Sequence, residues 1–215
     1  TPSADFQLTR CRRTIILIND ASTDGTHDLL TSLAADPAIA PFVRVAHHSV
    51  NQGKGAAIAT GLAHAKEIAA DLVLIHDADL EYDPADHHDI LAPILDGRAD
   101  AVIGSRFIGS THRVLYYWHS VANRLITLLS NMLTDLNLSD IECCSKAFTA
   151  PVAKQLTIEE PRFGLEPELV AKLSKMRLPD HDQGRESSRR LRIFEVPVSY
   201  AGRTYANSDE LRAAN

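Results

Sequence analysis

The sequence predicts an α/β protein with a mostly parallel sheet and helices on both faces. Between residues 14 and 103, short apolar runs alternate with longer segments of helical periodicity. That alternation is typical of consecutive βαβ units. Several of the runs are apolar throughout, as expected for strands that are buried on both faces of a parallel sheet. At 215 residues the chain fits one domain, 1–215.

The expected elements follow one another with little connecting chain. Strands are predicted at residues 14–19, 42–46, 71–76, 101–103 and 191–200. Helices are predicted at residues 24–35, 53–69, 85–95, 115–136 and 166–176. Outside these elements we expect an irregular leader at 1–13, a polar loop at 179–190 and a tail at 206–215.

Composition excludes several classes of protein. The net charge is −6 and no basic block occurs, so nucleic acid is not an expected partner. The three cysteines lack zinc-ligand spacing, and their odd number argues against a disulfide framework. A reducing, cytoplasmic compartment fits this pattern best.

The helix expected at 115–136 is amphipathic. Its apolar residues recur at helical spacing, but polar and charged residues interrupt it, which makes it a poor transmembrane candidate. We expect its apolar side to face the core. A helix that lies on a membrane surface is the alternative.

The most informative segment is the Asp-Ala-Asp triplet at 77–79. It follows the apolar run at 72–75 directly, so Asp77 and Asp79 should lie at the carboxyl end of a buried strand, where open α/β sheets bind ligands. Carboxylate oxygens suit Mg²⁺ or Mn²⁺, which proteins often share with substrate phosphates. The alternative is that both side chains only solvate the end of the strand.

Other residues add chemistry to the same end of the sheet. Asp20 ends the first strand, where it could accept hydrogen bonds from a nucleoside or cap the next helix. Lys54 lies between two glycines at a helix start, which suggests close approach to an anionic ligand or a simple cap. Arg106 follows a strand end and could hold a phosphate at two points. Arg124 and Thr127 lie three residues apart and should share one helix face.

Taken together, the motifs resemble those of family 2 glycosyltransferases of the GT-A fold, closest to the dolichyl- or polyprenyl-phosphate sugar transferases. The matching segments are Asn-Asp-Ala-Ser-Thr-Asp-Gly-Thr at 19–26, Asn-Gln-Gly-Lys-Gly at 51–55, Asp-Ala-Asp at 77–79, Gly-Ser-Arg-Phe at 104–107, Phe-Gly-Leu-Glu-Pro-Glu at 163–168, and Val-Pro-Val-Ser-Tyr at 196–200 with Gly-Arg-Thr at 202–204. The resemblance covers about residues 14–205.

The resemblance implies an inverting, metal-dependent transfer from a donor of the GDP-mannose or UDP-glucose type to a polyprenyl or dolichyl phosphate. The residues that it implies are Asp20, Lys54, Asp77 and Arg203 for the donor, Asp77, Asp79 and Glu81 for Mg²⁺ or Mn²⁺, and Arg106, Arg124 and Thr127 for the acceptor phosphate. Asp77, Asp79 and Arg106 are the implied catalytic residues. A protein of this kind is expected to be peripheral at the cytoplasmic face of a membrane, against the lipid or a membrane-anchoring subunit.

The sequence also departs from the family pattern. Relatives begin with a further strand that ends in a Pro-x-Tyr-Asn-Glu-like segment, and residues 1–13 do not resemble it. We therefore expect one edge of the strand at 14–19 to be exposed and the nucleotide pocket to lack a wall. The alternatives that stay open are a catalytically impaired nucleotide-sugar-binding fragment or accessory subunit, and a nucleotidyltransferase.

Overall fold

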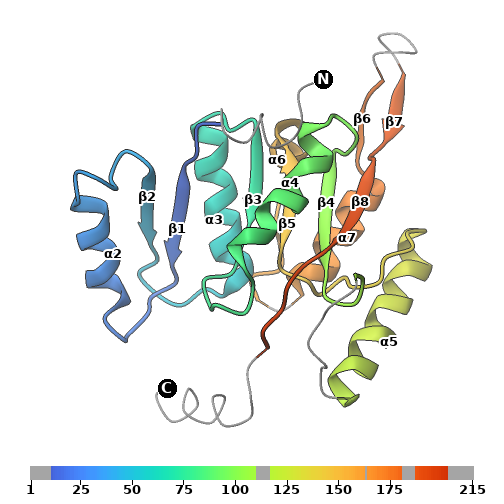
Figure 1. The fold of residues 1–215 in the computed structure, drawn as a ribbon, viewed down its shortest axis with the longest axis horizontal. Helices are drawn as coiled ribbons and strands as arrows, with labels where there is room; N and C mark the ends of the chain where they lie inside the picture. The colour runs from blue at the N-terminus through green and yellow to red at the C-terminus, as the bar shows by residue number, and fades with distance from the viewer. Residues whose placement is uncertain (1–10, 110–116, 163, 181–186, 203–215) are drawn as a thin grey trace.

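The computed structural model describes residues 11–109, 117–162, 164–180 and 187–202 (Figure 1). The strands are β1 (Ile15–Asn19), β2 (Val43–His47), β3 (Leu72–Ile75), β4 (Ala101–Ser105), β5 (Lys146–Thr149), β6 (Arg177–Pro179), β7 (Ser188–Arg190) and β8 (Ile193–Pro197). The helices are α2 (Thr26–Ala35), α3 (Lys54–Glu67), α4 (His87–Leu95), α5 (Tyr117–Thr134), α6 (Ala150–Gln155) and α7 (Leu165–Lys175), with a 3₁₀ turn at Pro84–Asp86.

The central sheet has four strands in the order β3-β5-β4-β8. β4 and β8 are parallel, whereas β5 runs antiparallel to both of its neighbours. β1 and β2 form a separate parallel pair, and β6 and β7 form a short antiparallel ribbon that projects from the body (Figure 1). The α/β prediction is confirmed, with one antiparallel strand inside the sheet.

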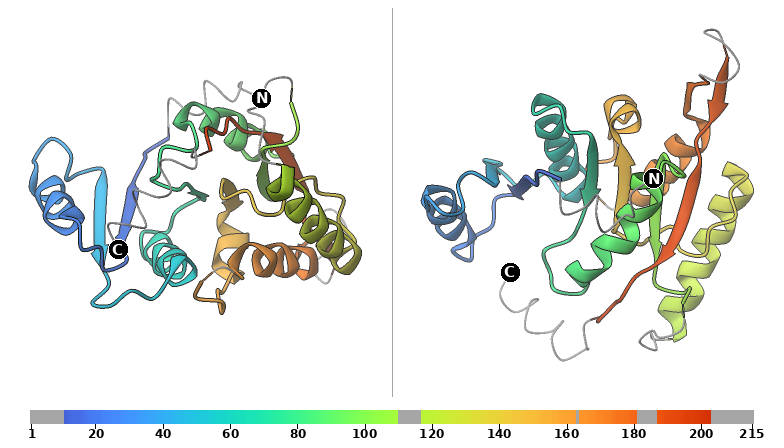
Figure 2. Two further views of the ribbon diagram at one scale, coloured as in Figure 1. Left: turned by 90° about the horizontal axis from the view of Figure 1, so that it is seen from below. Right: turned by 45° about the horizontal axis from the view of Figure 1, so that its top comes forward.

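Two apolar clusters cover the two faces of this sheet. α4 packs on one face, with Val102 and Ala147 beneath it. α3, α6 and α7 pack on the other, over Ile103 and Phe148 (Figure 2). Neighbouring residues of β4 and β5 therefore point to opposite faces, as the pleat requires.

In the described part of the chain, the β1-β2 pair and the central sheet are connected through α3 and not by strand pairing. Within the described residues β1 pairs only with β2, and β3 pairs only with β5. α3 lies against both β1 and β3 and joins the two parts. The edge of β1 that was expected to be exposed is therefore open in the described part of the chain.

Four elements were absent from the sequence-based prediction. β5 and α6 lie between residues 136 and 166, where no element was predicted. β6 and β7 lie at the two ends of the loop predicted at 179–190. β5 is four residues long and contains Lys146, a charged residue that is almost fully buried. A short run with a lysine in it does not look like a core strand.

α5 corrects the expectation of a core-facing apolar stripe. Its buried residues are Asn123 and Thr127, both polar. The exposed large apolar side chains on this helix are Tyr117, Trp118, Val121, Leu125, Ile126, Leu128, Leu129, Met132 and Leu133, which together are called the α5 apolar face. At 3.6 residues per turn they cover about half of the helix circumference.

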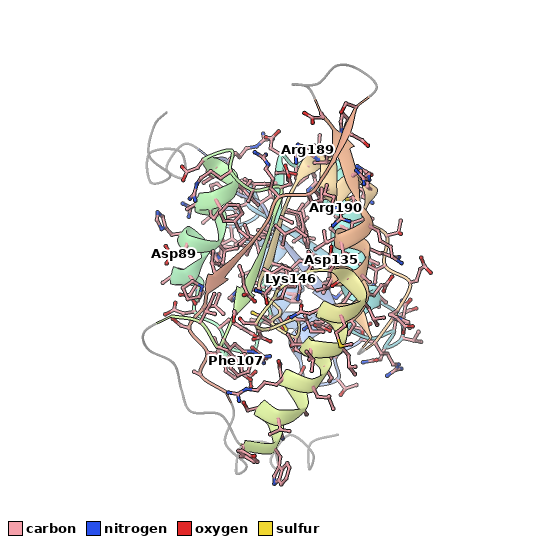
Figure 3. All side chains as sticks on the ribbon, turned by 90° about the vertical axis from the view of Figure 1, so that its right-hand side faces the viewer. Asp89, Phe107, Asp135, Lys146, Arg189 and Arg190 are labelled. Atoms are coloured by element: carbon pink, nitrogen blue, oxygen red, sulfur yellow. The ribbon has the colours of Figure 1, made fainter. Side chains whose placement is uncertain are left out.

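The inner side of α5 is attached to the domain through polar contacts. Asn123 donates to Asp140, and Asn131 exchanges two hydrogen bonds with the backbone of Leu138 (2.7 and 3.1 Å). Beyond the helix, Asp135 pairs with Arg190 of β7 (Figure 3). The helix is thus held by its polar side and presents its apolar side outward. Among the described helices, none is both long and apolar enough to cross a bilayer.

Candidate functional site

Asp77 and Asp79 lie just beyond the carboxyl end of β3, as predicted. Asp77 Oδ2 accepts a hydrogen bond from Lys54 Nζ at 2.9 Å. Asp79 Oδ1 accepts the backbone N–H of Glu81 at 3.1 Å, which closes a tight turn around Leu80. Leu80 is 90% exposed with φ of 61°, a left-handed conformation that is costly for leucine. The turn holds both carboxylates partly open to solvent.

The ammonium of Lys54 contacts the carboxylates of both Asp77 and Glu166, which with Asp79 form an acidic region. Its Nζ lies 2.9 Å from Asp77 Oδ2, 3.1 Å from Glu166 Oε1 and 2.6 Å from Cys144 Sγ. Burial alone would lower the pKa of Lys54, but the carboxylates of Asp77 and Glu166 raise it above its ordinary value. Burial raises the pKa of Cys144 to about 12, so the sulfur is a neutral thiol at pH 7.

Glu166 and Glu142 enlarge the acidic region. Glu166, on the first turn of α7, is nearly buried at 7% exposure. Burial and the charge of Glu166 raise the pKa of Glu142. The ammonium of Lys54 therefore lies between carboxylates that repel one another in its absence.

The glycines around Lys54 have a packing role. A Cβ on Gly53 would lie 2.5 Å from the carbonyl oxygen of Pro161, and one on Gly55 would collide with the backbone of Glu160. The Pro161 carbonyl also accepts the N–H of Ala56 in the first turn of α3 (3.2 Å). The segment at 160–161 thus crosses the start of α3 and partly caps it. Of the two interpretations of the glycines, this favours a helix cap over close approach of a ligand.

Asp20 is engaged within the protein. Its carboxylate accepts from the backbone of Gln52 (2.9 Å) and Gly53 (2.6 Å), and it bonds His48 Nδ1 at 2.7 Å. Burial would raise the pKa of Asp20, but hydrogen bonds from Gln52, His48 and Gly53 outweigh it and lower the pKa. Asp20 therefore orders the loop that leads to Lys54. A nucleoside would have to compete with these hydrogen bonds for the Asp20 carboxylate.

Arg106 forms a two-point ion pair with the buried Asp140, with Nε–Oδ2 and Nη2–Oδ1 distances of 2.7 and 2.8 Å. Its guanidinium also lies 5.2 Å from the centre of the Tyr200 ring and 5.7 Å from that of Phe107. Burial would lower the pKa of Arg106, but the contacts with Asp140 raise it. The pair with Asp140 uses two of the five guanidinium N–H bonds, so three point elsewhere.

The structure separates Arg124 from Thr127. Arg124 is exposed, whereas Thr127 is 4% exposed and donates its hydroxyl proton to Asn123 Oδ1 at 3.1 Å. The hydroxyl also lies 3.5 Å from the N–H of Ile141. Both residues were expected at the acceptor phosphate, but only Arg124 is open to solvent, because Thr127 is buried on the side that attaches α5.

Glu81 follows the turn that holds Asp79, but it forms hydrogen bonds with the residues that come after β8. Its Oε2 accepts the Tyr200 hydroxyl (3.0 Å), and its carbonyl accepts the N–H of Ala201 (2.8 Å). Tyr200 also forms an isolated bridge with Tyr82. Residues 200–201 therefore lie beside the acidic turn, while Arg203 lies outside the described residues.

The three-carboxylate set Asp77, Asp79 and Glu81 is not assembled. Nowhere in the described part of the chain do three His, Cys, Asp or Glu residues gather as a metal site. Two hard carboxylates at a strand end still fit Mg²⁺ or Mn²⁺ whose remaining ligands are diphosphate oxygens and water. The donor chemistry fits a divalent ion held by Asp77 and Asp79, without Glu81.

Sequence reasoning missed Asp140, Cys144 and His48. Asp140 and Arg106 are 34 residues apart, and no local pattern links them. His47 packs against His27, with 4.1 Å between the centres of the two tilted rings. His48 instead joins Asp20 to Thr60.

Comparison with known proteins gives the family context. The sequence model of glycosyl transferase family 2 matches residues 5–157. An undecaprenyl-phosphate mannosyltransferase from Micrococcus luteus is 26% identical over 204 residues, 90% of this chain and 74% of that protein. Glycosyltransferase AglJ from Haloferax volcanii is 29% identical over 75% of this chain and 49% of its own. A UDP-N-acetylglucosamine–dolichyl-phosphate N-acetylglucosaminyltransferase from Methanococcus voltae is 26% identical over 66% of this chain and 61% of its own. The chain thus spans half to three quarters of these relatives.

The fold has solved counterparts. Glucosyl-3-phosphoglycerate synthase from Mycobacterium tuberculosis, in complex with Mn²⁺, UDP and glucosyl-3-phosphoglycerate, superposes with a TM-score of 0.58 at 20% identity. The match covers 93% of this chain and 64% of that chain. At this identity the likeness concerns the fold alone, and it agrees with the predicted GT-A architecture.

Proposed function

This chain belongs to glycosyl transferase family 2, and on that basis we propose that it transfers a sugar from a nucleotide-sugar donor to a polyprenyl or dolichyl phosphate. The observation that carries the proposal is the position of Tyr200. Its hydroxyl bonds Glu81 beside the acidic turn, and its ring faces Arg106. One site therefore combines carboxylates suited to a cation with a guanidinium suited to a phosphate.

The donor side consists of Asp77, Asp79 and Lys54. A divalent ion held there would neutralise charge on the leaving diphosphate. Lys54 supplies a further positive charge beside Asp77. Asp20 contributes through its hold on the loop at 52–53. GDP-mannose and UDP-glucose represent the proposed donor class, and Arg203, which lies outside the described residues, stays a candidate for the diphosphate.

The acceptor side centres on Arg106. Asp140 fixes the guanidinium plane, and N–H groups that Asp140 does not use can donate hydrogen bonds to phosphate oxygens. Arg124 is exposed on the neighbouring helix and can add a second contact. Thr127 is not carried forward as a phosphate ligand because its hydroxyl is committed to Asn123.

The proposed reaction is an inverting displacement. A phosphate oxygen of the acceptor forms a bond to the sugar C1 while the bond from C1 to the diphosphate oxygen breaks, and the nucleoside diphosphate leaves. A phosphate monoester with a second pKa of about 6 is mostly ionised at pH 7, so no strong base is required. The work of the protein is then to orient two anionic reactants against their mutual repulsion.

The α5 apolar face is the proposed contact with the lipid surface that carries the acceptor. The helix has a basic residue, Arg124, and its sequence contains no Asp or Glu, which suits an anionic bilayer surface. Its inner side is continuous with the acceptor site through the contact from Asn123 to Asp140 and on to Arg106. A phosphate at Arg106 would therefore have its lipid chain near the membrane.

The test combines binding with turnover. A thermal-shift panel of GDP, UDP and their sugars, with and without Mn²⁺, identifies the donor because a ligand that binds the native state stabilises it. The selected donor is then incubated with polyprenyl phosphate in vesicles, and lipid-phosphate sugar is measured by mass spectrometry. We expect a metal-dependent shift and a sugar-linked lipid product. Metal-dependent binding without any lipid product would support the binding-fragment alternative.

A further inference from the structure

Lys54 occupies the place where a divalent ion would act on Asp77. Its ammonium contacts Asp77 Oδ2 at 2.9 Å, which leaves that oxygen with a cationic partner in the described structure. The same ammonium contacts Glu166 Oε1 at 3.1 Å. One lysine thus links the proposed metal ligand to a carboxylate that has no assigned role.

We propose that Lys54 is an internal cation that holds Asp77 until the divalent ion displaces it, and that Glu166 is the positioning residue that retains the displaced ammonium in the site. This inference rests on the proposed function, and it adds an exchange of cations at Asp77. In this exchange Lys54 passes from the carboxylate to the donor diphosphate.

Charge makes the exchange necessary. An ion bound to a carboxylate oxygen at about 2.1 Å would lie within a few ångströms of the ammonium on the same oxygen. Like charges at that spacing repel strongly in a partly desolvated site. The Lys54 side chain is 31% exposed, so it has room to withdraw, whereas the Glu166 side chain is 9% exposed.

Glu166 determines where Lys54 goes. It lies on the first turn of α7, and its Oε1 contacts the ammonium at 3.1 Å. Cys144 contacts the same ammonium, with Sγ 2.6 Å from Nζ and 3.9 Å from Glu166 Oε1, and gives it a soft acceptor beside Glu166. After displacement from Asp77, the ammonium keeps its charged partner at Glu166 and remains within the site for the donor phosphates.

The exchange is tested by Mn²⁺ affinity without nucleotide. We compare the wild type with Lys54→Met, Lys54→Arg and the control Lys66→Met, titrating Mn²⁺ and following the free ion by electron paramagnetic resonance. Lys66 lies on the same helix, and its Nζ bonds the Leu156 carbonyl, away from Asp77. We expect Lys54→Met to bind Mn²⁺ at least about fivefold more tightly, while Lys54→Arg and Lys66→Met match the wild type. An equal gain in Lys54→Arg, or no gain in Lys54→Met, would overturn the proposal.

A second measurement uses the wild-type protein and does not depend on how the variants fold. Lys54 and Lys66 are labelled with a short pulse of an amine-reactive reagent, and the two rates are compared by mass spectrometry with and without saturating Mn²⁺. We expect Mn²⁺ to speed labelling of Lys54 relative to Lys66. An unchanged ratio rejects the exchange. A protein that binds Mn²⁺ neither alone nor with nucleotide would instead contradict the metal dependence in the proposed function.

Discussion

The guanidinium of Arg106 is held at two points by the carboxylate of Asp140, a side chain that is completely shielded from solvent. Asp140 also accepts the backbone N–H of Arg106 and the amide of Asn123, each at 3.1 Å. The backbone of Asp140 is in turn fixed by Glu195 of β8. This network connects β4, α5 and β8 around one arginine, and it orients that arginine before any acceptor arrives.

The first prediction concerns Asp140→Asn. Removing one charge of a buried pair leaves the other without compensation, so the free energy of unfolding should fall by about 3 kcal/mol. Use of the acceptor should fall more than donor affinity, because Arg106 loses its orientation. Chemical denaturation and acceptor kinetics measure both. Asp96→Asn is the matched control, since its pair with Arg98 is largely exposed and should matter by less than about 1 kcal/mol. If Asp140→Asn and Asp96→Asn lose the same stability, the buried pair of Asp140 with Arg106 does not have the structural role described.

The second prediction concerns the α5 apolar face. Leu125→Ser combined with Leu129→Ser should weaken binding to anionic vesicles several-fold without lowering the unfolding midpoint, because both leucines are more than half exposed. Vesicle co-sedimentation measures the binding. Leu29→Ser, on α2 and 66% exposed, is the control. If the double variant binds vesicles as the wild type does, the lipid contact lies elsewhere; loss of a dimer in the variant would indicate a second copy on this face.

The third prediction is a pH dependence centred on Asp100. Burial would raise the pKa of Asp100, but hydrogen bonds from Arg189 and Arg192 lower it well below its ordinary value. A depressed carboxyl pKa gives stability that is present above the unfolded value of about 4 and lost as the pH falls further. The urea midpoint should therefore drop below pH 4 in the wild type. Asp100→Asn should be less stable at pH 7 and should lose less on acidification; parallel pH profiles for the two proteins would refute the assignment.

The fourth prediction concerns the edges of β1 and β3 that have no partner strand among the described residues. Strand edges without partners promote association between chains. The protein should therefore self-associate at high concentration in sedimentation experiments. Ile15→Lys places a charge on β1 at a residue that is 54% exposed, and it should reduce this association. A wild type that remains monodisperse at every concentration would show that these edges are protected in solution.

The sequence predicted the elements whose patterns are local. The apolar run of β3 stops at a cluster of carboxylates, so both the strand and the position of Asp77 and Asp79 could be inferred. β5 could not be inferred, because the burial of Lys146 depends on carbonyl partners at Ile141 and Cys143 that only the folded chain provides.

The site was predictable in its residue types and less so in its contacts. Lys54 was placed near the nucleotide because of its glycines, yet Gly53 and Gly55 are required by the crossing segment at 160–161. Glu81 belonged to the expected metal set because the family resemblance implied it, and Tyr200, 119 residues away, donates its hydroxyl to that carboxylate. Such partners come from tertiary packing, which no local pattern encodes.

The most direct test of the account is the Mn²⁺ dependence of nucleotide binding in Asp79→Ala, measured by titration calorimetry with the nucleoside diphosphate of the selected donor. Asp83→Ala is the control, because Asp83 is a nearby carboxylate that instead caps the 3₁₀ turn at Pro84–Asp86, where it accepts the N–H of Ala85. We expect Asp79→Ala to fold normally and to lose the gain in affinity that Mn²⁺ gives the wild type and Asp83→Ala. Unchanged Mn²⁺-dependent affinity in Asp79→Ala would contradict a metal-assisted nucleotide-sugar site at the end of β3.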